Sequence, residues 1–314
     1  MQTRRELLVG AGAYGLAATA ASREALAQDL GPDRLVLLGT KGGPSIRGIS
    51  QFPSASVLVV KGVPFVIDAG YGTVARLVAA KIPLPSVRRV FITHLHSDHV
   101  IELGSVFYNA WANGLKTPAE AYGPRGTQGV LAGYWQSMQF DIETRMADEG
   151  RPDLRKLVTA HEHGEGPVME ADGVRVSALR NLHPPVTDSF ALKFEFGGKV
   201  VVFSGDTAYF PPLADFARGA DYLVHEVMYG PALEALVRRN PNAATLFEHL
   251  KASHTLVDDV GRIAAAAGVK NLVLNHFVPA DDPSITDADW VAGMRGHFSG
   301  NVIVGRDLLE VPLV

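Results

Sequence analysis

Four side chains that can bind a metal ion lie within six consecutive residues: His94, His96, Asp98 and His99. They follow the apolar run 90–92, so we expect them just past the end of a buried strand. A strand places residues i and i+2 on one face, so His94 and His96 can present two imidazoles to one cation. Asp98 and His99 then turn towards a second position. Imidazole and carboxylate groups are good zinc ligands, and burying them without a metal would cost desolvation free energy that nothing compensates. The spacing therefore predicts a dinuclear metal site.

Three further residues of the same kind follow predicted buried strands. His183 precedes two prolines that end a strand, Asp206 follows the apolar run 200–203, and His276 follows the run 272–274. A single histidine after a strand is more often structural than functional. The recurrence of this placement is the stronger signal, because sites collect at strand ends on a rigid scaffold.

The segments that must position these residues alternate between short β-rich runs and helical stretches. Residues 141–165 have mixed polarity and are predicted to be only partly helical. The order of strands and helices predicts an α/β (α+β) fold with two sheets packed face to face and helices outside. Strands are predicted at 34–38, 56–60, 64–67, 174–179, 191–196, 200–203, 222–227 and 271–275, and helices at 73–81, 100–113, 127–140 and 255–267.

Composition excludes several kinds of chemistry. The 314 residues are 47% hydrophobic and 20% charged, which suits a globular protein with a sizeable core. Cysteine is absent, so disulfides, thiolate ligands and cysteine nucleophiles are excluded. The formal net charge of −4 provides no basic field for nucleic acid, which we therefore do not expect as a partner.

The N-terminus predicts export. Arg4 and Arg5 precede a Gly/Ala-rich apolar run, and 25–27 offers a small-x-small cleavage site. The segment resembles a bacterial twin-arginine signal, which implies a signal peptide at 1–27, a domain at 28–314 and a periplasmic location. The alternative is an amphipathic N-terminal helix. The run is too short and too rich in glycine to remain as a permanent membrane span.

The chemistry-bearing residues together resemble the ligand set of the metallo-β-lactamase superfamily, over nearly the whole chain from Leu38 onwards. The resemblance implies an αββα sandwich of two mixed sheets flanked by helices, with two Zn²⁺ ions at one edge and Mn²⁺ or Fe as alternatives. It implies that one ion is bound by His94, His96 and His183. It implies that the other is bound by Asp98, His99 and His276, with Asp206 bridging both.

Other segments resemble the ribonuclease Z and arylsulfatase branch. Residues 223–226 are similar to the His-Glu-Ala-Thr segment of ribonuclease Z, although Val227 and Met228 replace its last two residues. Residues 253–255 are similar to its His-Ser-Thr loop, with the serine on the other side. The resemblance implies that Glu226 and His254 form a relay that protonates the leaving group. A strand-end ion pair and an N-cap neighbour are the structural alternatives.

The expected reaction is hydrolysis. Zinc brings the pKa of its bound water towards about 7, and Asp98 can orient the resulting nucleophile. Ribonuclease Z holds RNA with a basic arm, but 141–165 contains seven acidic and four basic residues. We therefore expect an exported hydrolase of small sulfate or phosphodiester-type esters. Alternatives are hydrolysis of lactones or β-lactams, and a ribonuclease Z-like endoribonuclease.

Two alternatives from other classes are a di-iron redox enzyme and a non-catalytic binding protein. The nitrogen-rich ligand set favours zinc over iron, and the full ligand set favours catalysis. The resemblance also allows a homodimer. Among the remaining histidines, His161 and His163 are predicted to be solvated loop residues. His225, His249 and His297 are not assigned, although His225 could contact the rim of a substrate site.

Overall fold

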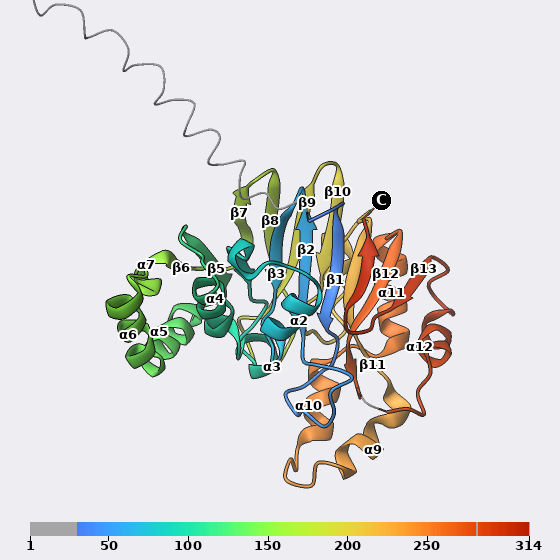
Figure 1. The fold of residues 1–314 in the computed structure, drawn as a ribbon. Helices are drawn as coiled ribbons and strands as arrows, with labels where there is room; N and C mark the ends of the chain where they lie inside the picture. The colour runs from blue at the N-terminus through green and yellow to red at the C-terminus, as the bar shows by residue number, and fades with distance from the viewer. Residues whose placement is uncertain (1–29, 281, 314) are drawn as a thin grey trace, which may run out of the picture.

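The computed structural model describes residues 30–280 and 282–313 and shows two sheets packed face to face with helices outside (Figure 1). This arrangement confirms the predicted αββα architecture. Each sheet has seven strands. The predicted signal peptide at 1–27 lies outside the described residues. Within them, every helix is too short or too polar to cross a lipid bilayer.

The first sheet combines antiparallel and parallel pairing. β14, β1, β2 and β3 are antiparallel neighbours, and β3 to β6 are parallel neighbours. In spatial order its strands are β14 (Leu309–Pro312), β1 (Arg34–Gly39), β2 (Ala55–Val60), β3 (Val63–Ile67), β4 (Arg89–Phe91), β5 (Ala119–Gly123) and β6 (Val158–Glu162).

The second sheet repeats this mixed pattern. β7 to β10 are antiparallel neighbours and β10 to β13 are parallel neighbours. The β9–β10 turn is the predicted Gly197-Gly198 pair, whose φ angles of 53° and 79° suit a tight hairpin. In spatial order the strands are β13 (Asn301–Val304), β12 (Asn271–Val278), β11 (Tyr222–Met228), β10 (Lys199–Phe203), β9 (Phe190–Phe196), β8 (Val174–Arg180) and β7 (Gly166–Ala171).

Helices cover the outer face of each sheet, and one pair extends beyond the sheets. The first sheet is accompanied by α2 (Thr73–Ala79), η1 (Leu84–Ser86), α3 (Ser97–Val100), α4 (Leu103–Ala112), α5 (Thr127–Ser137), α6 (Gln139–Glu149) and α7 (Leu154–Leu157). The second is accompanied by α8 (Pro212–Phe216), α11 (Val257–Ala267) and α12 (Asp287–Met294). η2 (Gly230–Ala232), α9 (Leu233–Arg238) and α10 (Leu246–Ser253) belong to the segment that projects below the sheets in Figure 1.

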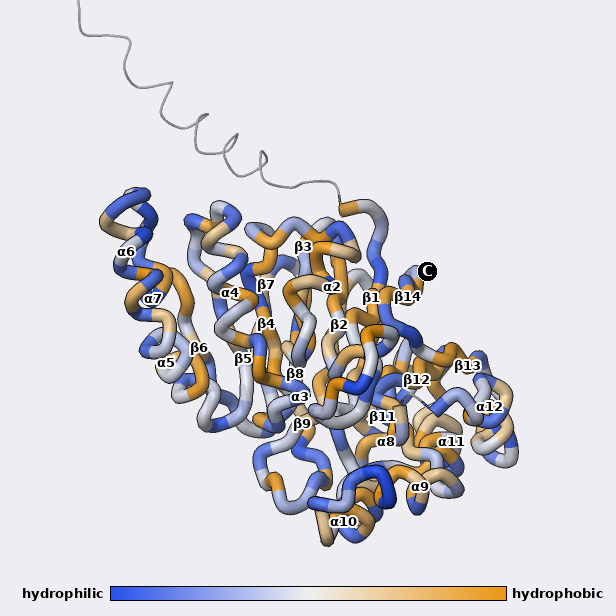
Figure 2. Tube along the Cα trace, turned by 60° about the horizontal axis from the view of Figure 1, so that its bottom comes forward, coloured by the Kyte–Doolittle hydropathy of each residue, from blue (hydrophilic) through white to orange (hydrophobic). Residues whose placement is uncertain are grey.

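The core between the sheets is aromatic and aliphatic, and the strands that form it include many apolar residues along the trace in Figure 2. Phe91 stacks on Tyr122 at 4.8 Å between ring centroids and meets the edge of Phe194 at 5.2 Å. Burying each such side chain stabilises the fold by about 1.5–3 kcal/mol. The sheets are therefore a rigid support for the loops at their edge.

Several boundaries differ from the sequence prediction, among them the helix predicted at 100–113, which begins at Leu103. β12 was expected to end at Asn275 but continues to Val278, with a register shift against β11 next to Glu226. The helix expected over 127–140 ends at Ser137, and a second helix, α6, begins at Gln139. Residues 141–165 include the rest of α6 together with α7 and β6. Their weak periodicity reflects these short elements.

Candidate metal centre and active site

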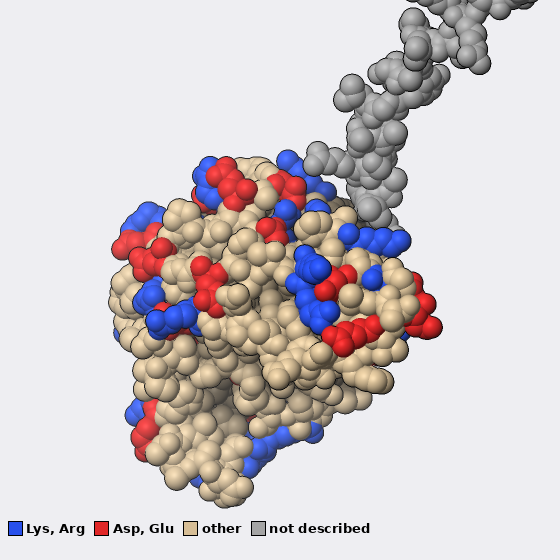
Figure 3. Space-filling view, turned by 90° about the vertical axis from the view of Figure 1, so that its left-hand side faces the viewer, with Lys and Arg blue, Asp and Glu red and all other residues tan. Residues whose placement is uncertain are grey.

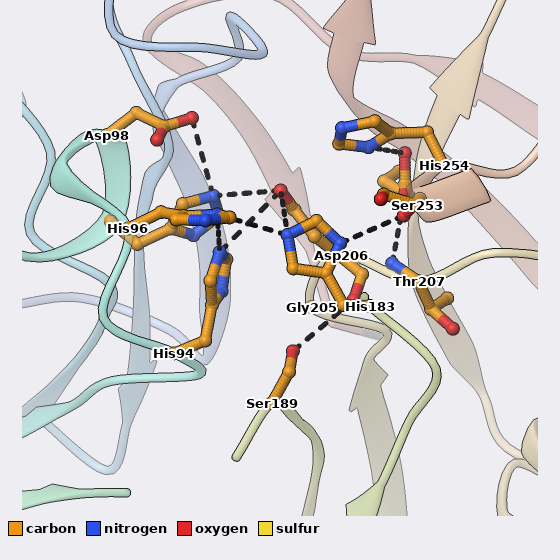
Figure 4. A network of polar contacts seen from close by, with 12 residues as sticks. His94, His96, Asp98, His183, Ser189, Gly205, Asp206, Thr207, Ser253 and His254 are labelled. Carbon is orange, nitrogen blue, oxygen red and sulfur yellow. Dashed lines mark hydrogen bonds and ion pairs between the residues drawn. The ribbon is translucent and has the colours of Figure 1, made fainter. Parts of the chain in front are cut away.

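The first group of expected metal ligands converges at the edge where the two sheets meet. His94 and His96 lie in the loop after β4, and His183 lies in the loop after β8 (Figure 4). His96 Nδ1 is 3.0 Å from both His94 Nε2 and His183 Nε2. Three imidazole nitrogens facing one another at this spacing suit a shared cation.

The second group lies directly beside the first. Ligand atoms of Asp98, His99, Asp206 and His276 lie within 4.8 Å of one another, as do those of the first group. Asp206 Oδ2 is 3.1 Å from His276 Nε2 and 3.3 Å from His99 Nε2. The same oxygen is 3.8 Å from His94 Nε2. Asp206 therefore faces both groups, which is the position that a bridging ligand requires.

Unpartnered polar atoms show that these residues fit metal ions. His99 Nε2 and Asp206 Oδ1 are buried and have no hydrogen-bond partner among the described residues. Buried polar atoms are rarely left in this state, because desolvation without a partner costs free energy. Imidazole nitrogens with carboxylate oxygens form a donor set that zinc accepts. The protein thus contains a potential His/Asp metal site.

Backbone conformation brings the second group into place. Gly205, just before Asp206, has φ of +58°, and a Cβ there would lie 2.7 Å from the Phe190 carbonyl oxygen. A side chain at this position would therefore displace the loop. His276 has φ of +46°, which is strained for a residue with a side chain. Such strain persists where the surrounding structure holds it, commonly at functional sites.

Hydrogen bonds fix the orientation of the histidines. His99 Nδ1 is 2.8 Å from Asp68 Oδ2, and His183 Nδ1 is 2.9 Å from the Ser253 carbonyl oxygen. Each bond turns the Nε2 atom of the ring towards the cluster, as outer partners of metal-binding histidines do. Asp98 Oδ2 accepts a hydrogen bond of 2.9 Å from the Gly43 amide. The role of Asp68 was not predicted from the sequence.

Electrostatics keep His94, His183 and Asp206 in the deprotonated forms that can bind a metal ion. Burial holds the pKa of His94 well below its ordinary value and lowers that of His183 to about 4. Burial opposes ionisation of Asp206, but His276 and His99 outweigh it and hold the pKa well below its usual range. His99 differs, since the carboxylates around it, led by Asp206, raise its pKa well above normal despite burial. The same negative field would attract a metal cation.

Glu226 and His254 form a buried pair beside the cluster. Glu226 Oε2 is 2.9 Å from His254 Nδ1, and Glu226 Oε1 accepts a 2.6 Å hydrogen bond from the Thr207 amide. The His254 ring stacks on that of His276 at 5.5 Å. Burial opposes protonation, yet the Glu226 carboxylate raises the pKa of His254 to about 9. This imidazole is therefore held in its protonated form at neutral pH.

A cavity of about 280 Å³ opens from the cluster. Its walls come from the β1–β2 loop, from α9 and α10, and from the residues after β12. The cationic side chains on these walls are Lys41, Arg47 and Arg239, and the apolar ones include Leu236 and Leu250. Arg47 closes one side by donating a 2.6 Å hydrogen bond to Asn240 Oδ1. The cavity thus combines positive charge with an apolar wall next to the metal ligands.

Three of the remaining histidines differ from what the sequence suggested. His225 is fully buried in β11, which excludes the contact with a substrate rim that the sequence left open. His161 lies in β6 rather than in a loop, stacked on Tyr122 at 4.8 Å. His163 is half-buried rather than solvated. His249, which the sequence left unassigned, lies on α10 and lines the cavity.

In the segment 141–165, where acidic residues outnumber basic ones, the arginines are paired with carboxylates. Arg145 pairs with Asp141 at 2.9 Å and with Glu149 at 2.7 Å, and Arg155 pairs with Glu143 at 3.2 Å. Figure 3 looks at the side of the molecule that carries α5–α7, where basic and acidic side chains are interspersed. This face does not present the continuous positive surface that phosphate backbones attract.

Comparisons with known proteins identify one matching family model and a set of relatives named ribonuclease Z. The family model described as anti-Pycsar protein Apyc1 matches residues 34–238. Ribonuclease Z of Mycobacterium bovis is 31% identical over 280 residues, which cover 88% of this chain and 97% of the relative. Ribonuclease Z of Mycobacterium marinum is 30% identical with the same coverage.

Solved structures share the fold at lower identity. The metallo-β-lactamase fold protein YhfI of Bacillus subtilis superposes with a TM-score of 0.66 at 19% identity, over 90% of this chain and 100% of that one. Short-form human tRNase Z gives 0.64 at 19% identity, with the same coverage. Zn²⁺-bound PqqB of Methylobacterium extorquens gives 0.63 at 16% identity, over 89% of this chain and 100% of that one.

Proposed function

The chain belongs to the metallo-β-lactamase superfamily, in the branch of ribonuclease Z and the Apyc1 family, and from this premise we propose that it cleaves RNA-type phosphodiester bonds. Its relatives are metal-dependent hydrolases. The observation that carries the proposal is the double ligand cluster at the floor of a cavity with cationic walls. A phosphodiester is an anion, so cationic walls would help to bind it and metal ions held by the cluster would activate the water that cleaves it.

Each part of the site has a role in this reaction. His94, His96 and His183 would hold one zinc ion, and Asp98, His99 and His276 the other, with Asp206 between them. Bound zinc would supply Lewis acidity, which activates a water molecule near neutral pH and offsets the charge of the phosphate. Asp98, fixed by the Gly43 amide, would orient the attacking water.

His254 would protonate the departing oxygen. It lines the cavity beside the cluster, and the Glu226 carboxylate keeps the ring protonated at neutral pH. A positioned proton donor of this kind typically accelerates a reaction by about 10²–10⁴-fold. Glu226 acts through His254 and is therefore a positioning residue.

The choice of phosphorus over sulfur follows from the relatives. The sequence favoured small sulfate or phosphodiester-type esters, and ribonuclease Z was its alternative. Relatives named ribonuclease Z at 30% identity and above do not support sulfate hydrolysis and fit that alternative better. Lys41, Arg47 and Arg239 suit the phosphate of such a substrate.

Parallel assays of the zinc-loaded protein test the proposal. The substrates are a short RNA with a 3′ extension, a bis-aryl phosphodiester and an aryl sulfate. We expect chelator-sensitive turnover of the RNA and the diester, loss of both in His96→Ala, and retention of both in His297→Ala. Faster turnover of the sulfate, or diester cleavage that resists chelation, would overturn the assignment.

Export remains part of the proposal. The paired arginines at positions 4 and 5 suggest that the enzyme acts in the periplasm after transport as a folded protein. Its RNA-type substrate would then be extracellular or periplasmic.

A further inference from the structure

His249 stands beside the first group of metal ligands without belonging to it. It lies on α10 in the wall of the cavity, and its ring centroid is 6.4 Å from that of His96 and 6.2 Å from that of His183. The His254 ring is 5.9 Å away. A substrate whose phosphate rests on the cluster would therefore place its neighbouring groups against His249.

The hydrogen bonds around His249 decide which of its nitrogens carries the proton. The Ser253 hydroxyl donates its one hydrogen to the Pro184 carbonyl oxygen. Ser253 Oγ lies 3.3 Å from His249 Nδ1 and can only accept there, so Nδ1 carries the ring hydrogen. In the neutral ring, Nε2 is then a hydrogen-bond acceptor. Among the described residues, Nε2 has no partner.

This acceptor is matched to a particular class of substrate. We propose that His249 Nε2 accepts a hydrogen bond from the ribose 2′-hydroxyl next to the scissile phosphate, so that this residue selects ribonucleotide over deoxyribonucleotide substrates. The inference rests on the proposed function and assigns recognition of the ribose 2′-hydroxyl to His249. The 2′-hydroxyl is the group by which a protein distinguishes RNA from DNA at a given position.

Other groups near the cluster are poorly suited to this task. Asp98 and Asp206 face the metal positions, and His254 is already paired with Glu226. Arg47 and Arg239 are donors as well, and suit phosphate rather than hydroxyl. Asn240 also lines the cavity, but its Oδ1 already accepts a hydrogen bond from Arg47. His249 Nε2 is an acceptor that lies directly beside the ligand cluster.

Substitution at the sugar of the cleaved linkage tests the inference. Three short RNAs differ only at that 2′ position, which carries a hydroxyl, a hydrogen or a fluorine. Only the first has an O–H group that can donate a hydrogen bond. For the zinc-loaded wild type we expect kcat/KM to favour the hydroxyl by about tenfold, the effect of one hydrogen bond. His249→Ala should reduce the preference to about one- to twofold. His249→Gln, whose amide oxygen still accepts, should restore part of it, and His297→Ala should keep all of it.

Equilibrium binding gives a second readout. Calorimetry should show that the wild type binds a ribonucleoside monophosphate more tightly than its 2′-deoxy analogue, and that His249→Ala abolishes the difference while zinc content stays at the wild-type level. A preference that survives in His249→Ala would overturn the role of His249 alone. Absence of chelator-sensitive cleavage of all three RNAs would overturn the proposed function and this inference with it.

Discussion

Replacing His254 by alanine should slow the hydrolysis of substrates with poor leaving groups far more than that of activated aryl esters. The structure gives the reason. Glu226, at 2.9 Å, raises the pKa of His254 to about 9 against the effect of burial, so the ring is a cationic donor at neutral pH. An alkoxide leaving group needs this proton, whereas an activated aryl oxide departs without it.

The size of the effect follows from burial and charge. His254 is only 8% exposed, so water has little access to replace the missing donor. We therefore expect a loss of about 10³-fold for alkyl leaving groups, within the range known for general acids, and less than about tenfold for aryl ones. Glu226→Gln keeps the shape of the pair but removes the charge that raises the pKa. Without that charge, burial should hold the pKa of His254 below its ordinary value, so the ring should be almost wholly neutral at pH 8.

A series of phosphodiesters with leaving groups of decreasing acidity provides the assay. kcat/KM is measured for the wild type, both variants and His297→Ala, with zinc content determined in parallel. On alkyl substrates the wild-type rate should fall as pH rises through about 9, and this fall should move to lower pH in Glu226→Gln. An equal loss for every leaving group, with zinc content preserved, would refute the proton-donor reasoning.

Three further changes have defined outcomes. Asp68→Asn removes the carboxylate that orients His99 and should weaken zinc affinity by about 10- to 100-fold in a chelator competition, whereas an unchanged affinity would show that the contact is passive. Asp221→Asn should lower the free energy of unfolding by about 1 kcal/mol at pH 7, because Asp221 bonds Lys270 and the Val200 amide. Burial opposes but does not cancel the lowering of the Asp221 pKa by Lys270 and the Val200 amide. The contribution is therefore fully present above about pH 4 and is lost as pH falls through the lowered pKa of the folded state, so the difference between the two proteins should shrink steadily in denaturation experiments at decreasing pH. Fusion of residues 1–40 to a reporter should direct the reporter to the periplasm, and replacement of the two arginines at 4 and 5 by lysine should reduce the exported fraction. An unchanged exported fraction would contradict a twin-arginine signal.

The sequence was most informative where chemistry and periodicity coincide. His94 and His96 follow a buried strand at the i, i+2 spacing, and the apolar runs before Asp206 and His276 are strands whose ends meet at one edge. Because the side-chain period of a strand is two, such runs locate both the core and the edge where ligands can gather. The expected ligand positions therefore needed little tertiary information.

The features that were missed depend on contacts between distant segments. Asp68 meets His99 across 31 positions of sequence, and the Ser253 hydroxyl that orients His249 bonds a carbonyl 69 positions away. β12 continues past His276, and His276 itself has a left-handed backbone conformation. Nothing in the neighbouring sequence predicts that conformation for a histidine. His161 was taken for a loop residue because its strand, at the sheet edge, is mostly exposed and polar. Whether such a segment forms a strand depends on pairing with a neighbouring strand more than on the β-propensity of its residues.

The contact between Arg47 and Asn240 has a consequence for how this scaffold can diversify. It joins the β1–β2 loop to the end of α9, and neither of these segments contributes a residue to the double ligand cluster. Insertions or exchanges around Arg47 and Asn240 would reshape the entrance while leaving in place the ligand cluster and the Gly43 amide that holds Asp98. New specificities can thus arise here by loop replacement, without rebuilding the machinery that breaks the bond.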